Sequence, residues 1–132
     1  MKNLSLLCLL AVALMAAKCG SGPAFPKEVY GQTWLYSYEE DSADVRTYRP
    51  NTFDFPASRG RTGFMIKEDG TFINYAIAPT DGLEEQPGTW AAQSKNILNV
   101  QLEVAPGKTH TIEIVSATPA VLKIKRRSSE EQ

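Results

Sequence analysis

The chain has 132 residues, with 14 Lys and Arg against 15 Asp and Glu, two cysteines and one histidine. This length fits a single domain behind a targeting segment. The balanced charge, with basic residues scattered along the chain, argues against nucleic-acid binding. A single histidine also excludes a metal site built from several histidines of one chain. Neither a metal nor a cofactor is expected.

The N-terminal segment has the pattern of an export signal. Met1 to Asn3 form a short positive start, residues 4–17 form an apolar run, and small side chains end that run. The run is shorter than the about 20 residues that a transmembrane helix needs. Cys8 lies inside it, so Cys19 is the only cysteine of the remaining chain.

Cys19 is the predicted site of lipid attachment. An unpaired thiol is a liability in an oxidising compartment, and a Gly-Ser-Gly-Pro stretch that follows it has the composition of a tether. The segment resembles a bacterial lipoprotein signal, although Lys18 is unusual in front of the acylated cysteine. We expect a cell-envelope protein anchored to a membrane by lipid. Secretion after cleavage behind Ala17 is the alternative.

The chain after this segment reads as one β domain. The expected organisation is a signal peptide at 1–18, a tether at 19–28, a barrel domain at 29–127 and a disordered tail at 128–132. Alternating patterns predict strands at 29–38, 61–68, 71–78, 88–93, 96–104, 108–116 and 120–126, with an eighth around 45–48. Each later strand has one apolar and one polar stripe, as in antiparallel sheets with one solvated face. Short strands joined by tight loops favour an all-β fold, an antiparallel up-and-down β-barrel of about eight strands.

The dipeptide Asp69-Gly70 lies between two alternating runs and predicts a two-residue hairpin turn. Such a turn pairs Phe64 with Tyr75, and strand parity then defines the two faces. The first expected face holds Phe64, Ile66, Ile73, Tyr75 and Ile77. The second holds Met65, Lys67, Phe72 and Asn74.

Three short motifs occur in a suggestive order. Gly31-Gln32-Thr33-Trp34 opens the first strand, Asp69-Gly70-Thr71-Phe72 belongs to the central hairpin, and Gly88-Thr89-Trp90 starts a later strand. This order is similar to the lipocalin-like domains of small bacterial lipoproteins, which are eight-stranded antiparallel barrels. The resemblance covers about 29–126 and implies the fold more strongly than it implies ligand binding. The chain departs from lipocalins proper, which use Gly-x-Trp and often have a disulfide and a C-terminal helix.

The expected function is a binding module that takes a small apolar or amphipathic ligand. Aromatic walls with polar tips are typical of ligand pockets. The candidate ligand-binding residues are Trp34, Tyr36, Tyr38, Phe64, Tyr75, Trp90 and His110. An eight-stranded barrel is only just wide enough for its own side chains, which counts against a large cavity.

Residues 46–61 suggest an alternative function, a protein-protein interaction module of the envelope such as an inhibitor or assembly accessory. Arginine and aromatic side chains anchor interfaces and bind carboxylates, and long irregular loops are often functional. The candidate partner-binding residues are Arg46, Arg49, Phe53, Phe55, Arg59 and Arg61. A structural role is also open, in which the two phenylalanines cover one barrel end and the arginines balance the acidic run 39–44.

Catalysis is not expected. The chain has no Gly-x-Ser-x-Gly motif, no phosphate-binding glycine loop and no calcium-loop spacing in its acidic run. The basic cluster 123–127 alternates with apolar residues and is typical of the solvent face of a final strand. No catalytic residue is therefore assigned, and the protein is not expected to be an enzyme.

Overall fold

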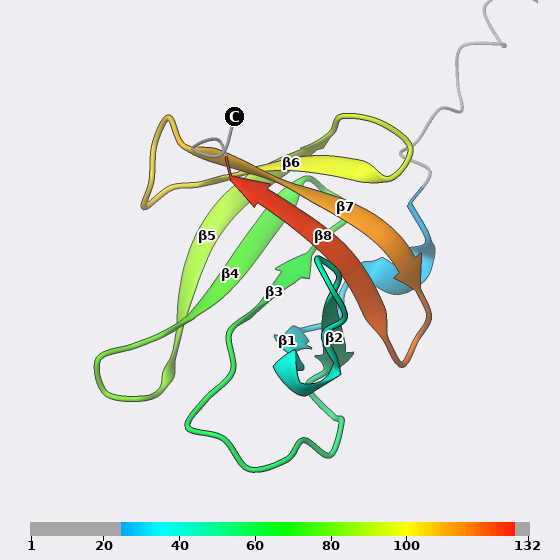
Figure 1. The fold of residues 1–132 in the computed structure, drawn as a ribbon. Coiled ribbons are helices and arrows are strands. Elements are labelled where there is room, and N and C mark those ends of the chain that lie inside the picture. The colour runs from blue at the N-terminus through cyan, green and yellow to red at the C-terminus, as the bar shows by residue number, and fades with distance from the viewer. Residues whose placement is uncertain (1–24, 129–132) are drawn as a thin grey trace, which may run out of the picture.

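The computed structural model describes residues 25–128, so the predicted signal and Cys19 lie outside the described residues. Eight antiparallel strands form a closed barrel, as expected from the sequence (Figure 1). The strands are β1 (Trp34–Tyr36), β2 (Arg46–Pro50), β3 (Gly63–Ile66), β4 (Thr71–Ile77), β5 (Leu83–Ala92), β6 (Ile97–Leu102), β7 (Thr109–Ala117) and β8 (Leu122–Ser128). Two short 3₁₀ helices, η2 (Lys27–Val29) and η3 (Tyr38–Glu40), flank β1.

The order of strands around the barrel is β1-β2-β8-β7-β6-β5-β4-β3. From β3 to β8 each strand pairs with the next one in the chain, up and down. β1 lies between β2 and β3, so the connection 51–62 has to pass the end of β1 before it enters β3. This connection is the long loop along the lower edge of the view in Figure 1.

The β3–β4 hairpin differs from the expected one by a single residue. The Lys67 amide donates to the Thr71 carbonyl oxygen at 3.0 Å, and the Gly70 amide donates to the Lys67 carbonyl oxygen at 3.3 Å. Gly70 has a φ of 92°, a conformation that glycine adopts without strain. The turn therefore contains three residues with glycine at the left-handed position, the next most common hairpin loop after the two-residue type.

This longer turn reverses the faces of β4. Phe64 lies opposite Asn74, and Ile66 lies opposite Phe72, which is almost fully buried. A slip of one residue moves every side chain of a strand to the other face. Tyr75 therefore points away from the barrel interior, and the prediction that it lines the barrel with Phe64 is wrong.

One end of the barrel is closed by the segment before β1. Phe25 and Val29 are buried, and each such side chain contributes about 1.5–3 kcal/mol to stability. The indole Nε1 of Trp34 donates to the Val29 carbonyl oxygen at 3.0 Å. Trp90 packs edge-on against Phe25, with 5.7 Å between ring centroids. Phe25, which the sequence placed in the tether, is therefore packed against the barrel.

The barrel interior holds large apolar side chains. The largest fully buried side chains are Trp34, Phe64, Phe72, Ile66, Leu98, Ile112, Leu122 and Ile124. They come from six of the eight strands and form one cluster. An eight-stranded barrel filled in this way has a core like that of any globular domain.

Candidate functional site at the polar end of the barrel

Three basic side chains face inward at the end of the barrel that η2 does not close. Arg46 lies opposite Ile124, which is fully buried and so marks the inward face. Arg126 follows Ile124 by two residues on β8 and shares its face. His110 lies opposite Ser128 on the same face. The three side chains thus occupy diagonal positions on the adjacent strands β2, β8 and β7, within reach of one another.

Tyr48 lies between the two arginines. Its side chain is only 2% exposed. Burial raises the pKa of Tyr48, and the charges and hydrogen bonds of Arg126 and Arg46 oppose that shift. The phenol therefore stays neutral and lies close to both guanidinium groups. We call Arg46, Tyr48, His110 and Arg126 the polar end.

A series of ring contacts forms the floor beneath the polar end. Tyr36 stacks on Tyr48 with 5.2 Å between centroids, and Tyr48 contacts Phe64 at 4.8 Å. Phe64 stacks on Phe72 at 5.6 Å, and Phe72 contacts the His110 ring edge-on at 6.0 Å. Each such pair adds about 0.5–1.5 kcal/mol beyond burial. The floor is therefore continuous and well packed.

His110 has an unused hydrogen-bonding atom. Its Nε2 is buried and has no hydrogen-bond partner within residues 25–128. Such atoms are rare in folded proteins and cost about 1–3 kcal/mol each. Burial, together with the charge of Arg126, lowers the pKa of His110 to about 4. The imidazole is therefore neutral near pH 7.

A hollow of about 230 Å³ opens beside the polar end, at the β6–β7 connection. Its lining residues are Leu102, Ala105, Lys108, Thr109, His110, Arg126 and Ser128. Ligand pockets usually measure about 300–1,000 Å³, so this hollow suits only a small group. It combines apolar side chains with Arg126 and the imidazole.

On the far wall, the side chains of Asn74 and Gln86 are joined by a hydrogen bond of 2.8 Å from Nδ2 to Oε1. They lie opposite each other in the β4–β5 register, two residues beyond the buried Phe72. Both therefore face inward at the same end as the polar end. This wall therefore carries a hydrogen-bonded pair of amide side chains at the mouth of the barrel.

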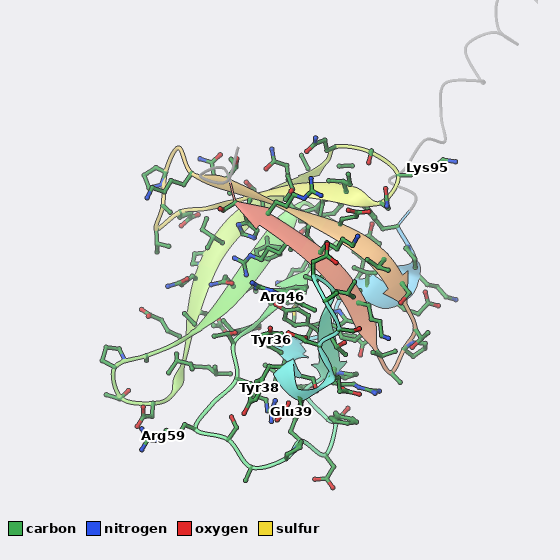
Figure 2. The ribbon with its side chains drawn as sticks, viewed as in Figure 1. Tyr36, Tyr38, Glu39, Arg46, Arg59 and Lys95 are labelled. Atoms are coloured by element: carbon green, nitrogen blue, oxygen red, sulfur yellow. The ribbon has the colours of Figure 1, made fainter. Side chains whose placement is uncertain are left out.

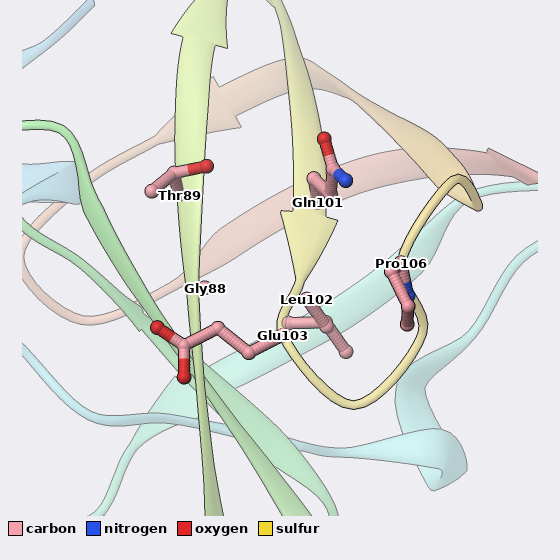
Figure 3. Close-up of a pocket in the computed structure, with 6 residues that line it drawn as sticks. All are labelled: Gly88, Thr89, Gln101, Leu102, Glu103 and Pro106. Atoms are coloured by element: carbon pink, nitrogen blue, oxygen red, sulfur yellow. The ribbon is translucent and has the colours of Figure 1, made fainter.

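A second hollow, of about 290 Å³, lies between β5 and β6 (Figure 3). Its lining residues are Gly88, Thr89, Gln101, Leu102, Glu103 and Pro106. The two strands approach so closely here that a Cβ on Gly88 would lie 2.4 Å from the Gln101 carbonyl oxygen. Glu103 is the only ionisable residue of this lining, so the hollow offers no group of residues for acid-base or metal chemistry.

The candidate partner-binding arginines have internal partners. Arg61 is 8% exposed and forms a bidentate salt bridge with Glu39. Its Nη1 lies 2.8 Å from Oε2 and its Nη2 lies 2.5 Å from Oε1. It also donates to the carbonyl oxygens of Tyr36 and Pro56. The hydrogen bond from Arg61 is the main cause that lowers the pKa of Glu39. Arg61 therefore fastens the long loop to η3.

Arg49 is held in the same way. Its Nε and Nη2 donate to the two Glu40 carboxylate oxygens at 2.9 and 2.6 Å. This contact lowers the pKa of Glu40 to about 2. The Arg49 guanidinium also lies 4.7 Å from the Phe53 ring. The expected balance between arginines and the acidic run is thus observed.

The remaining loop candidates lie outside the barrel core. Phe53 is 37% exposed and packs edge-on against Phe55 at 5.0 Å, and neither ring belongs to the core cluster. Arg59 lies at the outer edge of the loop, whereas Arg46 lies near Tyr36 (Figure 2).

The structure therefore brings together only part of the expected ligand lining. Tyr36 and His110 lie in or beside the polar end. Trp34 and Phe64 belong to the buried core, and Trp90 lies at the closed end. Tyr38 is half exposed and contacts the edge of Tyr36 at 6.2 Å.

Sequence reasoning missed Tyr48 and Arg126. The signal for Arg126 is the alternation of β8, because Leu122, Ile124 and Arg126 form one stripe whose first two members are buried. Tyr48 follows Arg46 by two residues on the expected eighth strand and could have been found by the same parity.

Comparison of the chain with protein-family models, with curated proteins and with solved structures gave no match. Across the described part of the chain, no helix is long and apolar enough to cross a membrane. In the same part, no three His, Cys, Asp or Glu side chains lie together as possible metal ligands.

Proposed function

We propose that the protein is a lipid-anchored, lipocalin-like lipoprotein of the cell envelope that binds a small amphipathic ligand at the polar end of its barrel. The observation that carries the proposal is the inward-facing group of Arg46, Arg126 and His110 above an aromatic floor. Ligand sites typically combine apolar walls with a few converging polar groups. The polar end has this composition, and the opposite end is closed by η2.

The packed interior limits the ligand to the mouth of the barrel. Phe64 and Phe72 are almost fully buried and in contact with each other, directly below Tyr48. A long chain could enter only by displacing these rings. The ligand is therefore small and lies partly in the hollow beside Leu102.

Binding can be tested by native mass spectrometry of protein that lacks residues 1–19. The protein is incubated with a lipid extract of the envelope and then passed through a desalting column. We expect an additional mass of a small molecule on the folded protein. A spectrum with only the unliganded mass after this incubation would contradict the proposed binding.

Anchoring at Cys19 has its own test. Cells that express the full chain or Cys19→Ala are grown with a labelled fatty acid, and the protein is isolated. We expect label on the full chain and none on the variant. If neither protein carries label, the anchor is refuted while ligand binding stays open to its own test.

The alternative is an interaction module that uses residues 46–61. The exposed Phe53 ring and the outlying Arg59 favour it. Against it, Arg49 and Arg61 are already committed to Glu40 and Glu39. Loss of a co-purifying protein in a Phe53→Ser, Arg59→Ser double variant would support this alternative.

A further inference from the structure

We propose that the polar end recognises the acid group of its ligand, so that the ligand is a small monoanionic amphiphile. This inference rests on the proposed function, because it concerns the same site. The site contacts the acid group of the ligand, and that group lies at the polar end.

Arg46 and Arg126 have no ion-pair partner among residues 25–128. The two aspartates that precede Arg46 in the chain are engaged elsewhere. Asp41 accepts hydrogen bonds from the Tyr36 hydroxyl and the Thr47 amide, and Asp44 pairs with Lys125 at 3.6 Å. The two guanidinium groups at the mouth are therefore available to an anion.

Arg46 and Arg126 are diagonal neighbours on β2 and β8 and share the inward face. Like charges in such positions repel each other. An anion bound between the two guanidinium groups would attract both and offset this repulsion. The planar guanidinium matches a carboxylate with two parallel hydrogen bonds. Arg46 is further held over the Tyr36 ring, with 5.7 Å from Cζ to the centroid.

The hollow beside the polar end can hold the remainder of the ligand. The lining of the hollow of about 230 Å³ includes the cationic Arg126 and Lys108 and the apolar Leu102 and Ala105, so charged and apolar side chains lie in one small space. At about 30 Å³ per water, its volume equals roughly eight waters. A ligand of about ten non-hydrogen atoms fits this size, and ligands so small bind with modest affinity. The free Nε2 of His110 offers one more hydrogen bond beside the acid group.

The test is an NMR titration of ¹⁵N-labelled protein lacking residues 1–19, with octanoate, octan-1-ol and acetate as separate probes. We expect octanoate to shift the amide signals of Tyr48, His110 and Arg126. It should bind about tenfold more tightly than octan-1-ol, the difference expected from one charge-assisted hydrogen bond. Acetate, which has the charge without the tail, should bind more weakly than octanoate.

Three variants complete the design. Arg46→Gln and Arg126→Gln should each weaken octanoate binding by about tenfold. Arg127→Gln is the matched control, because it removes the same charge from the next position of β8, on the outward face. It should change the affinity less than twofold, within the small effects of screened surface charges. The spectrum of each variant shows directly that it is folded.

The outcomes separate the two proposals. If octanoate and octan-1-ol bind equally, or if Arg127→Gln weakens octanoate as much as Arg126→Gln does, recognition of the acid group is refuted while the binding module stands. If acetate binds as tightly as octanoate, the polar end is an anion site and the amphiphile is refuted. If none of the probes shifts any signal at the polar end, both proposals fail.

Discussion

Two pairs of arginines in this barrel show how position decides what one side chain does. Arg49 and Arg61 each form a bidentate salt bridge with a glutamate of η3 and hold the long loop in place. Arg46 and Arg126 face the barrel mouth with no carboxylate partner in the described chain. Arg46 and Arg49 are three residues apart on one strand, so the pleat directs them to opposite faces. The arginines paired with glutamates stabilise the fold, and the two without a carboxylate partner are those at which we propose that the ligand binds.

The largest expected effect is at Arg61. Arg61→Gln removes the contact with Glu39 and leaves the carbonyl oxygens of Tyr36 and Pro56 without their donor. We expect the free energy of unfolding to fall by about 3 kcal/mol, as for the loss of a buried charged donor. Urea denaturation measures this value, with the exposed Arg59→Gln as control. A loss for Arg61→Gln no larger than that of the control would contradict the structural role.

Protonation of His110 in acid should lower the free energy of unfolding, by a somewhat smaller amount than Arg61→Gln does. The pKa of His110 is about 4 in the folded protein, against 6.5 for an ordinary histidine. Between these values the unfolded chain binds a proton that the folded protein does not, so stability falls as the pH drops from about 6.5 to 4. We expect the free energy of unfolding to fall by about 2 kcal/mol. This is less than the full pKa difference implies, because solvent screens the charge of the partly exposed His110 ring.

The matched variant is His110→Gln, measured by urea denaturation across the same pH range. This variant should show no fall in the free energy of unfolding between pH 6.5 and 4.5, and it should keep the fall below pH 4.5. Glu40, whose pKa is lowered to about 2, loses its contribution only as the pH falls from 4.5 towards 2. An unchanged slope between pH 6.5 and 4.5 in the variant would show that another group is responsible.

A moderate effect is expected at Arg49. Its contact with Glu40 is partly exposed, so Arg49→Gln should lower the free energy of unfolding by about 1 kcal/mol. The difference between wild type and variant should shrink in 1 M salt because exposed charges are screened. A loss equal to that of Arg61→Gln would contradict the distinction between a buried and an exposed pair.

The smallest effect is expected at the unpaired arginines. Arg46→Gln and Arg126→Gln should leave stability unchanged or raise it by a few tenths of a kcal/mol, because they relieve repulsion between like charges. Thermal denaturation beside Arg127→Gln measures the change. A loss above about 1 kcal/mol in either variant would mean that the contacts of these arginines with Tyr48 and Tyr36 stabilise the fold more than their mutual repulsion destabilises it.

Much of the barrel follows from local pattern in the sequence. The strands after residue 62 alternate clearly, and the structure has them close to the expected places except β5, which begins at Leu83 and not at residue 88. The predicted faces of β4 were wrong because Asp69-Gly70 fits both a two-residue turn and the three-residue turn that forms. The additional turn residue exchanges the two faces of the strand that follows. Local sequence does not distinguish these turns.

The candidate site was predictable only in part. The inward position of Arg126 is implied by the stripe that Leu122 and Ile124 begin, whereas its proximity to Arg46 depends on β2 pairing with β8. That pairing joins distant parts of the chain and leaves no mark in either strand. The same holds for Arg61, which meets Glu39 only because the loop returns past β1.

The most direct test of the account is the pKa of the His110 ring with and without octanoate. His110 is the only histidine of the chain, so its ring signals in ¹H–¹³C spectra need no assignment by mutagenesis. An anion bound beside the imidazole favours its charged form, so saturating octanoate should raise the pKa from about 4 by one unit or more. A pKa that stays near 4 at saturating octanoate would contradict an acid group bound at the polar end.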